Sequence, residues 1–294
     1  MRLAIAIPTF NRASMLDAVL RSYVPTCEEL GVGVFLSDNG SSDDTPEVCR
    51  AWSERSHLVR YSRHETTVPV GRNIMTAMEG SGAEYAWFAG DDDFLIPSRI
   101  RDVLAAVSEG DPSAVVVHTI EVPHPEFARL DAPLAEQLAP VLARGDAASD
   151  ARRVRYDEAA AFFEAKHYRL PAPSVVYRTA TTLASDYDRY IPTHHPHIGA
   201  LFDALAREQA DRGRVDVVEL TAVHSISLTV HDAHGKKNWS DIFRFLALEG
   251  FPLWFSLLPP IYAPHLPGAM AFHRHIFRAA FEEQASSDAV RRAP

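Results

Sequence analysis

Short apolar runs alternate with amphipathic stretches along residues 1–115. The runs have the length of buried strands, and between them apolar residues recur at helical spacing. Strands are expected over 3–7, 32–36, 58–61, 85–89 and 114–117, and helices are expected to begin near Ser14, Thr45, Gly71 and Ser98. Ser14 and Ser98 are expected to cap their helices, and Pro46 strengthens the start at Thr45. This alternation predicts an α/β fold with a mostly parallel sheet flanked by helices.

Polar side chains gather where these strands end. The clusters are Thr9 with Asn11, Asp38 with Asn39, Arg72 with Asn73, and Asp91 to Asp93. In open parallel sheets, ligands bind beyond the carboxyl ends of the strands. Because all four clusters fall at or near that edge, the sequence predicts a binding site there.

Three consecutive aspartates, Asp91 to Asp93, directly follow the apolar run 85–89. Adjacent carboxylates at the end of a buried strand repel one another unless a cation or hydrogen-bond donors meet them. A divalent metal held there would neutralise the charge of a diphosphate leaving group. The alternative is a solvated loop before the next helix, but the position at a strand end favours a metal site.

Residues 116–294 carry weaker signals. The stretch 122–153 is rich in Pro, Ala and Asp and is expected to be a connection. Helices are expected over 157–166 and 198–212, strands over 174–178, 215–223 and 225–230, and further helices towards the end. We therefore expect the chain to have three parts, residues 1–115, 116–235 and 236–294, of which the last is a helical extension.

Composition narrows the class of protein. The formal net charge is −10, and no run of Lys or Arg forms a stripe that could track a phosphate backbone, so nucleic acid is not expected as a partner. Cys27 and Cys49 have no metal-binding spacing and are expected to be buried thiols in a reducing cytoplasm. The apolar start ends at Pro8 without the pattern of a signal peptide, and no uninterrupted apolar run is long enough to span a bilayer. A cytoplasmic protein is expected, with peripheral membrane contact as a further option.

Four motifs in order resemble the family 2 glycosyltransferases. They are Ile5-Ala6-Ile7-Pro8-Thr9-Phe10-Asn11-Arg12, Ser37-Asp38-Asn39-Gly40-Ser41-Ser42-Asp43-Asp44-Thr45, Gly71-Arg72-Asn73, and Asp91-Asp92-Asp93 followed by Pro97. The resemblance covers roughly the first 110 residues. It implies a GT-A fold, a nucleoside diphosphate sugar donor, and Mg²⁺ or Mn²⁺. The first part would then bind the donor and the second part the acceptor.

The resemblance also assigns residues. Those expected to line or support the nucleotide are Pro8, Thr9, Phe10, Asn11, Arg12, Asp38, Asn39, Gly71, Arg72 and Asp91, with Asp38 at the base. Asp92 and Asp93 are expected at the metal. Many members have an acid where this chain has Gly90, so the resemblance leaves open which aspartate ligates the metal.

The acceptor side departs from the family. Members usually place a catalytic base in a Glu-Asp pair at a helix start, where this chain reads His194-His195-Pro196-His197 and, further on, Asp203. A histidine can accept a proton near neutral pH. His195, His197 and Asp203 are therefore candidate bases, with packed or exposed structural side chains as the alternative.

Two late segments carry further expectations. His231 to Trp239 resembles a His-Gly-x-x-Asn element of some members, which makes His234 a candidate metal ligand and Lys236 and Lys237 candidates to cover an anionic donor. The apolar stretch Phe245 to Leu258 is expected to be a core helix or a homodimer surface rather than an interfacial segment.

The expected activity is that of a glycosyltransferase that uses a metal ion and moves a sugar to a hydroxyl acceptor, and the resemblance implies inversion at the anomeric carbon. A UDP- or dTDP-linked donor is expected over a GDP-linked one, and the acceptor is a glycan, a lipid-linked molecule or a secondary metabolite. The alternatives are a degenerate GT-A nucleotide-binding module, a sugar-phosphate nucleotidylyltransferase and, more remotely, a metal-dependent hydrolase. The first strand is not followed by the glycine-rich loop of a nucleotidylyltransferase or a dehydrogenase.

Overall fold

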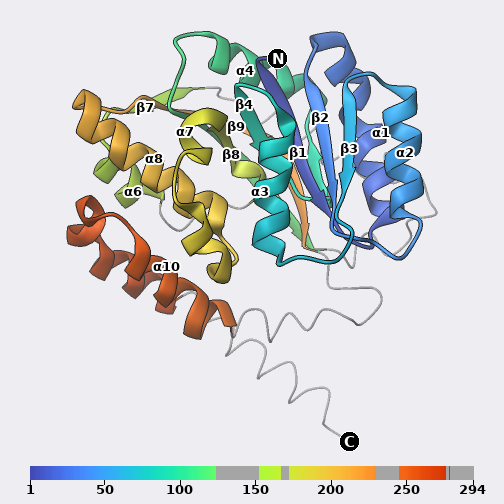
Figure 1. The fold of residues 1–294 in the computed structure, drawn as a ribbon. Coiled ribbons are helices and arrows are strands. Elements are labelled where there is room, and N and C mark those ends of the chain that lie inside the picture. The colour runs from blue at the N-terminus through green and yellow to red at the C-terminus, as the bar shows by residue number, and fades with distance from the viewer. Residues whose placement is uncertain (124–151, 167–171, 230–244, 276–277, 279–294) are drawn as a thin grey trace, which may run out of the picture.

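The computed structural model describes residues 1–123, 152–166, 172–229, 245–275 and 278. One mixed sheet runs through the middle of this part of the chain, and helices cover both of its faces (Figure 1). The strands are β1 (Leu3–Thr9), β2 (Gly33–Asp38), β3 (Val59–Arg63), β4 (Tyr85–Phe88), β5 (Asp93–Leu95), β6 (Ala114–Pro123), β7 (Arg153–Tyr156), β8 (Val175–Arg178) and β9 (Val217–Thr229).

The strand order is β3-β2-β1-β4-β8-β6-β9-β5, and β7 also pairs with β9. Strands β1 to β4 are mutually parallel, and β6 and β9 are parallel to each other. Strands β5, β7 and β8 run antiparallel to their neighbours. The prediction of an α/β fold with a sheet flanked by helices is confirmed, and the sheet is mixed, with its four mutually parallel strands at the N-terminal end of the chain.

The helices are α1 (Ala13–Leu30), α2 (Thr45–Arg55), α3 (Val70–Ser81), α4 (Pro97–Ser108), α6 (Ala159–Lys166), α7 (Thr179–Leu183), α8 (Pro196–Arg212) and α10 (Phe251–Leu257). Shorter turns of helix are η2 (Ala172–Ser174), η3 (Tyr187–Thr193), η4 (Leu246–Gly250) and η5 (Pro260–His265). None of the helices in the described ranges is long and apolar enough to cross a membrane.

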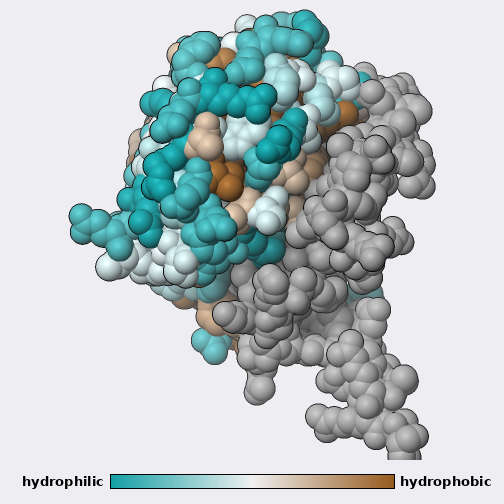
Figure 2. Space-filling model, turned by 90° about the vertical axis from the view of Figure 1, so that its right-hand side faces the viewer, coloured by the Kyte–Doolittle hydropathy of each residue, from teal (hydrophilic) through white to brown (hydrophobic). Residues whose placement is uncertain are grey.

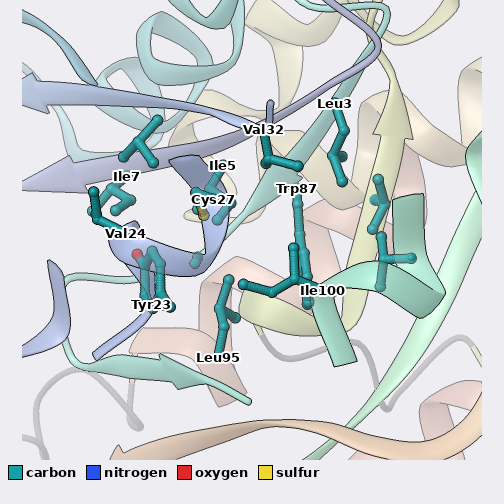
Figure 3. Packing of buried hydrophobic residues seen from close by; sticks show 14 of the residues in the cluster. Leu3, Ile5, Ile7, Tyr23, Val24, Cys27, Val32, Trp87, Leu95 and Ile100 are labelled. Atoms are coloured by element: carbon teal, nitrogen blue, oxygen red, sulfur yellow. The ribbon is translucent and has the colours of Figure 1, made fainter. Parts of the chain in front are cut away.

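Two apolar cores lie on opposite faces of the sheet, because successive residues of a strand point to opposite sides. Ile5 and Trp87 belong to the core beneath α1 and α4, whereas Ala6 and Phe88 belong to the core beneath α3 and α8. In the first core, Tyr23 and Cys27 of α1 belong to the same cluster of buried side chains as Trp87 (Figure 3). The outer surface on the α1–α2 side is mostly hydrophilic, with hydrophobic residues in small separate spots (Figure 2).

Several local expectations were wrong. Helix α1 begins at Ala13 and α4 at Pro97, and neither has a side-chain capping bond, so Ser14 and Ser98 do not act as the expected caps. Pro97 accounts for the earlier start of α4, since its fixed φ suits the first turn of a helix. The two strands expected over 215–230 form the single strand β9, which has a register irregularity against β6. The apolar stretch after Phe245 buries Trp254 and Phe255 in the second core.

Candidate active site

The ends of four neighbouring strands place polar side chains in one row. Thr9 is the register partner of Asp38, and Asp38 is the register partner of Arg63. On the other side of β1, the Thr9 hydroxyl donates a hydrogen bond to Asp91 Oδ2 at 2.7 Å. The row therefore reads Asp91, Thr9, Asp38, Arg63 across the carboxyl edge of the sheet, where the sequence predicted a site.

The aspartate triplet forms a tight turn between β4 and β5. The Gly90 N–H donates to Asp93 Oδ2 at 2.6 Å, and the Asp93 N–H donates back to the Gly90 carbonyl. Asp93 is buried as the first residue of β5. A Cβ on Gly90 would lie 2.9 Å from Asp92 Oδ1 and 3.0 Å from Asp93 Oδ2. The turn thus has no room for a side chain at position 90 unless these carboxylates move.

The three aspartates differ in how well they suit a metal ion. Within the described ranges, no three His, Cys, Asp or Glu side chains are grouped so that they could hold a metal by themselves. Mg²⁺, however, is usually bound through one or two carboxylates together with substrate phosphates. Asp91 and Asp92 are half-buried at the strand end and fit this arrangement, whereas the Asp93 carboxylate is buried in the turn. His234, Lys236 and Lys237 lie outside the described residues.

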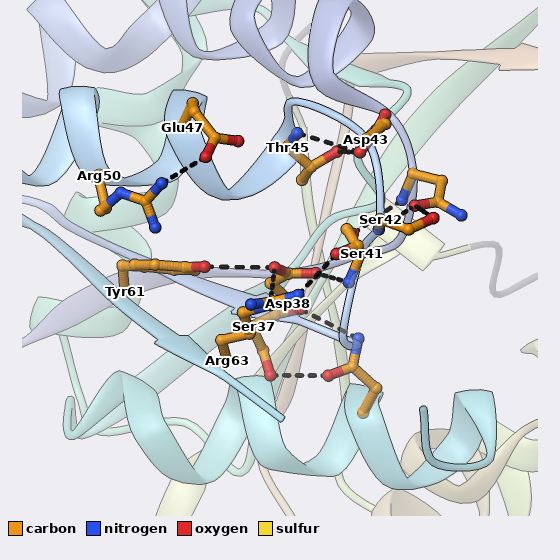
Figure 4. A network of polar contacts seen from close by, with 12 residues as sticks. Ser37, Asp38, Ser41, Ser42, Asp43, Thr45, Glu47, Arg50, Tyr61 and Arg63 are labelled. Carbon is orange, nitrogen blue, oxygen red and sulfur yellow. Dashed lines mark hydrogen bonds and ion pairs between the residues drawn. The ribbon is translucent and has the colours of Figure 1, made fainter. Parts of the chain in front are cut away.

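Asn11 and Arg12 join the loop after β1 to the loop after β2. Asn11 has a φ of 54°, and its Oδ1 accepts the Ser42 N–H at 2.8 Å. The Asn11 N–H donates to the Ser41 hydroxyl, and the Arg12 N–H donates to Thr45 Oγ1. Figure 4 shows this network around Ser41, Ser42 and Thr45. Phe10, between the row and this network, has 42% of its surface exposed.

Asn39 holds a third loop in place. Its Nδ2 donates to the Val68 carbonyl and its Oδ1 accepts the Val68 N–H, both at 2.9 Å. Both ends of the side-chain amide are therefore used to fix the loop between β3 and α3. The structure places Asn39 at the site as a positioning residue for that loop.

Asp38 is completely buried. Its Oδ1 accepts the Ser41 N–H at 2.9 Å, and its Oδ2 lies 3.2 Å from the Tyr61 hydroxyl and 3.3 Å from Arg63 Nε (Figure 4). Three donors from the chain itself thus satisfy the carboxylate that was expected to meet the base. Burial raises the pKa of Tyr61, and the neighbouring Asp38 charge raises it further.

Arg72 contacts the second half of the chain. Its Nη2 forms an ion pair with Asp188 at 2.6 Å, and its guanidinium lies over the Tyr187 ring. The next residue, Asn73, is the one that enters the sheet edge, where it exchanges hydrogen bonds with Ser37. A Cβ on Gly71 would lie 3.0 Å from Pro196, so Gly71 permits close packing of α3 against the start of α8.

The histidine segment lies beside the end of β4. The His197 ring packs edge-on against Phe88, with ring centroids 4.7 Å apart, and Phe88 ends the strand that leads into Asp91. His197 is buried, and its position against Phe88 and Tyr177 gives it the surroundings of a core residue. His195 lies at the N-cap of α8 and stacks on Phe251, and its Nε2 has no hydrogen-bond partner among the described residues.

Burial governs the charge of these histidines. It lowers the pKa of His195 to about 4, with smaller contributions from His194 and His273. It lowers the pKa of His197 well below the ordinary value, and the nearby His195 lowers it further. Both rings are therefore neutral at pH 7, which is the form in which an imidazole can accept a proton.

Asp203, the third candidate base, is held by two side chains. Arg189 Nη2 lies 2.7 Å from both of its oxygens, and the Tyr190 hydroxyl lies 2.8 Å from Oδ1. Burial raises the pKa of Asp203 against the opposing effects of Tyr190 and Arg189. These contacts tie α8 to η3 through Asp203, whereas His195 Nε2 and His197 Nδ1 are both buried without a hydrogen-bond partner among the described residues.

The sequence analysis did not identify two site residues that contact Asp38, namely Tyr61 and Arg63. The strand was expected to end at residue 61, but β3 continues to Arg63 and brings its side chain level with Asp38. The alternation of Val59, Tyr61 and Arg63 on one side of a strand was the available signal.

Two curated relatives illustrate what the chain is similar to. Abequosyltransferase RfbV of Salmonella typhimurium is 30% identical over 98 residues, which are 32% of this chain and 29% of the relative. Validoxylamine A glucosyltransferase of Streptomyces hygroscopicus subsp. jinggangensis is 30% identical over 135 residues, which are 42% of this chain and 31% of the relative. The chain thus matches about a third of the length of these relatives.

Solved structures share the fold at low identity. S. aureus TarS 1–349 in complex with UDP-GlcNAc has a TM-score of 0.57 at 15% identity, covering 90% of this chain and 72% of that one. The mannosyltransferase PcManGT of Pyrobaculum calidifontis, in complex with GDP-Man and Mn²⁺, has a TM-score of 0.56 at 14% identity, covering 97% and 75%. The sequence model of Glycosyl transferase family 2 matches residues 4–183. The chain therefore belongs to glycosyl transferase family 2, with an α/β GT-A fold.

Proposed function

We propose that the protein transfers a sugar from a nucleoside diphosphate sugar to a hydroxyl acceptor, with inversion at the anomeric carbon. The observation that carries this proposal is the row Asp91, Thr9, Asp38, Arg63 at the carboxyl edge, in a chain of this family. Neighbouring strands lie about 4.8 Å apart, so the row extends over about 14 Å. That extent suits an elongated nucleoside diphosphate.

The residues have separate roles in this proposal. Asp91 and Asp92 would hold Mg²⁺ or Mn²⁺, which supplies positive charge to the diphosphate leaving group when bound. Thr9 orients Asp91 through the hydrogen bond between them. Asn11, Asn39 and Asn73 fix the loops and helix around the nucleotide, so that the site is formed before the donor binds.

The acceptor hydroxyl needs a base in a single displacement. We assign this role to His195, because its side chain lies at the start of α8 and is only partly buried, whereas the His197 side chain is buried. His197 is enclosed between rings, and Asp203 is occupied by Arg189 and Tyr190. Transfer of the acceptor hydroxyl proton to the His195 ring would leave the acceptor oxygen free to attack the anomeric carbon as the nucleotide leaves.

Similar proteins support the donor class. TarS was solved with UDP-GlcNAc, and PcManGT with GDP-Man and Mn²⁺. The names of the relatives describe the transfer of abequosyl and glucosyl groups. We propose a UDP- or dTDP-linked sugar as the donor, and a glycan, lipid-linked molecule or secondary metabolite as the acceptor. Peripheral membrane contact and a homodimer remain part of this proposal.

Calorimetric titration tests the donor site directly. UDP, GDP and dTDP are titrated with and without Mn²⁺ into the wild-type protein and Asp92→Ala. We expect Mn²⁺-dependent binding of UDP or dTDP, weakened roughly tenfold or more in the variant, because a carboxylate next to the metal is lost. Failure of every nucleotide to bind would contradict the proposal. Binding without donor turnover or hydrolysis would favour the degenerate binding module.

The base assignment has its own test. His195→Gln is expected to lower kcat by roughly 10²–10⁴-fold with little change in nucleotide affinity, because general-base catalysis contributes about that much. Asp203→Asn, compared at equal folded concentration, should retain far more activity. The reverse order of the two effects would assign the base to Asp203.

A further inference from the structure

Asp38 has no exposed surface with which it could contact the base of a nucleotide in this structure. Its side chain is fully buried, and its two oxygens already receive the Ser41 N–H, the Tyr61 hydroxyl and Arg63 Nε. Because Asp38 has no exposed surface, the N–H of a nucleotide base could reach the carboxylate only after a neighbouring group had moved. Removing the cation from a buried carboxylate is unfavourable, because an uncompensated buried charge remains.

Arg63 occupies the position from which a base can be contacted. It ends β3, level with Asp38, and 46% of its side chain is exposed. Nε lies 3.3 Å from Asp38 Oδ2, and Nη2 donates to the Ser41 carbonyl at 2.7 Å. Within the part of the chain that the structure describes, Nη1 has no partner. Figure 4 shows the guanidinium beside Asp38, on the strand next to it.

The order of the row fixes which end of a nucleotide lies here. Asp91, the half-buried carboxylate suited to the metal and diphosphate, is at one end, and Arg63 is three strands away at the other. A nucleotide that lies along the row with its diphosphate at Asp91 therefore brings its base towards Arg63.

We infer that the Arg63 guanidinium, held in place by the buried Asp38, reads the base and selects keto bases over amino bases. The inference rests on the proposed function and specifies the nucleotide of the same site. A guanidinium has only donors, so its unpaired N–H groups need acceptors. Uracil, thymine and guanine present a carbonyl oxygen on the edge where cytosine and adenine present an amino group. Asp38 is then a positioning residue that keeps the guanidinium in a fixed plane.

The test compares UDP with CDP, two nucleotides that differ at this carbonyl or amino group. Both are titrated with Mn²⁺ into the full chain, as wild type, Arg63→Met and Arg60→Met. Methionine keeps much of the unbranched side chain but has no donor. Arg60 is the matched control, because it lies on the same strand but donates to the Gly80 and Ser81 carbonyls at the end of α3. Thermal melting checks that each variant is folded.

We expect wild type and Arg60→Met to bind UDP roughly tenfold more tightly than CDP. Arg63→Met should lose most of this preference through weaker UDP binding, with CDP affinity within about twofold of wild type. If Arg63→Met does not fold, Arg63→Lys keeps the charge beside Asp38 without the planar fork and should lose most of the preference.

Three results would overturn the inference. A folded Arg63 variant that keeps its preference, or binds UDP more tightly, would show that the uncovered Asp38 reads the base. Equal binding of UDP and CDP by wild type would show that no keto base is selected. If wild type binds neither nucleotide, nor GDP or dTDP, the proposed function fails as well, and that outcome is distinct from the other two.

Discussion

Gly90 shows how one missing side chain shapes the acidic turn. Its N–H binds Asp93 Oδ2, and the space where a Cβ would stand is bordered by the Asp92 and Asp93 carboxylates. The departure from the family pattern at this position therefore has a steric reason in the structure. The turn holds Asp93 inward and leaves Asp91 and Asp92 as the half-buried carboxylates.

Gly90→Ala is expected to disturb this turn. The added methyl group forces the carboxylates apart, so the free energy of unfolding should fall by about 1–3 kcal/mol, as for other overpacked sites. Mn²⁺-dependent nucleotide affinity should fall as well, because Asp92 moves. Urea unfolding and calorimetry measure the two effects. Gly268→Ala is the control, since a Cβ there meets nothing within 4 Å. Unchanged nucleotide affinity in Gly90→Ala would contradict the expectation.

The buried histidines predict a loss of stability in mild acid. The pKa of His195 is lowered from 6.5 to about 4, and that of His197 is lowered well below 6.5, in both cases mainly by burial. Between pH 6.5 and 4 the unfolded chain binds protons that the folded chain does not, so stability falls as the pH falls through this range. The Tm should therefore drop steadily from neutral pH towards pH 4.

A variant separates this effect from general acid unfolding. His197→Leu removes one titrating ring and should give a shallower decrease in Tm between pH 6.5 and 4 than wild type. Parallel curves for wild type and His197→Leu would mean that His197 does not contribute.

The contact between η3, α8 and α10 fixes the helix that carries the histidines. Arg189 and Tyr190 of η3 bind Asp203 of α8, and the Tyr190 hydroxyl also lies 3.0 Å from the Leu257 carbonyl of α10. Gly199 faces the Tyr190 ring, and a Cβ there would lie 2.4 Å from it. One buried tyrosine thus joins three elements that are separate in the sequence.

Asp203→Asn should weaken this contact and leaves the proposed base, His195, unchanged. Arg189 would lose its anionic partner and Asp203 its charge, so we expect a loss of about 2–4 kcal/mol in the free energy of unfolding. Asp211→Asn makes the same chemical change at an exposed position of α8 and should cost no more than about 0.5 kcal/mol. Urea unfolding at pH 7 measures both. Equal effects of the two changes would refute a special role for Asp203.

The sheet connects the two halves that the sequence analysis separated at residue 115. Strand β8 pairs with β4, and β5 pairs with β9, so strands from beyond residue 115 border both ends of the acidic turn. Val176, Val218 and Ile226 from the later strands also belong to the first core. The halves differ in the chemistry proposed for them but share one sheet and its cores.

A fragment of residues 1–115 is therefore not expected to fold cooperatively. It would expose the edges of β4 and β5 and lose part of the first core. Circular dichroism during heating should show a broad transition for the fragment and a sharp one for the full chain. A fragment that melts sharply and binds nucleotide with Mn²⁺ would show that the first 115 residues are an independent domain.

Much of the fold was predictable because periodicity is a local property. The runs around Ile5, Val34 and Trp87 are apolar on both faces, as expected for parallel strands covered by helices on two sides. The position of the site was predictable as well, because the carboxyl ends of parallel strands lie at the same edge of the sheet. Boundaries at Ala13 and Pro97 differed from expectation because a capping side chain only adds to a start that packing and proline already determine.

By itself, the sequence determined the strand-helix alternation, the edge at which polar side chains collect, and the family motifs. Only the tertiary structure decided which of those side chains are hydrogen-bonded within the chain. The side chains of Asp38, Asn39 and Asp203 accept hydrogen bonds from other residues of the protein. His195 Nε2 has no hydrogen-bond partner within the described residues. Arg63 lies in the row because it is the register partner of Asp38. The physical reason is that hydrogen-bond partners come from residues distant in sequence, which no local pattern specifies.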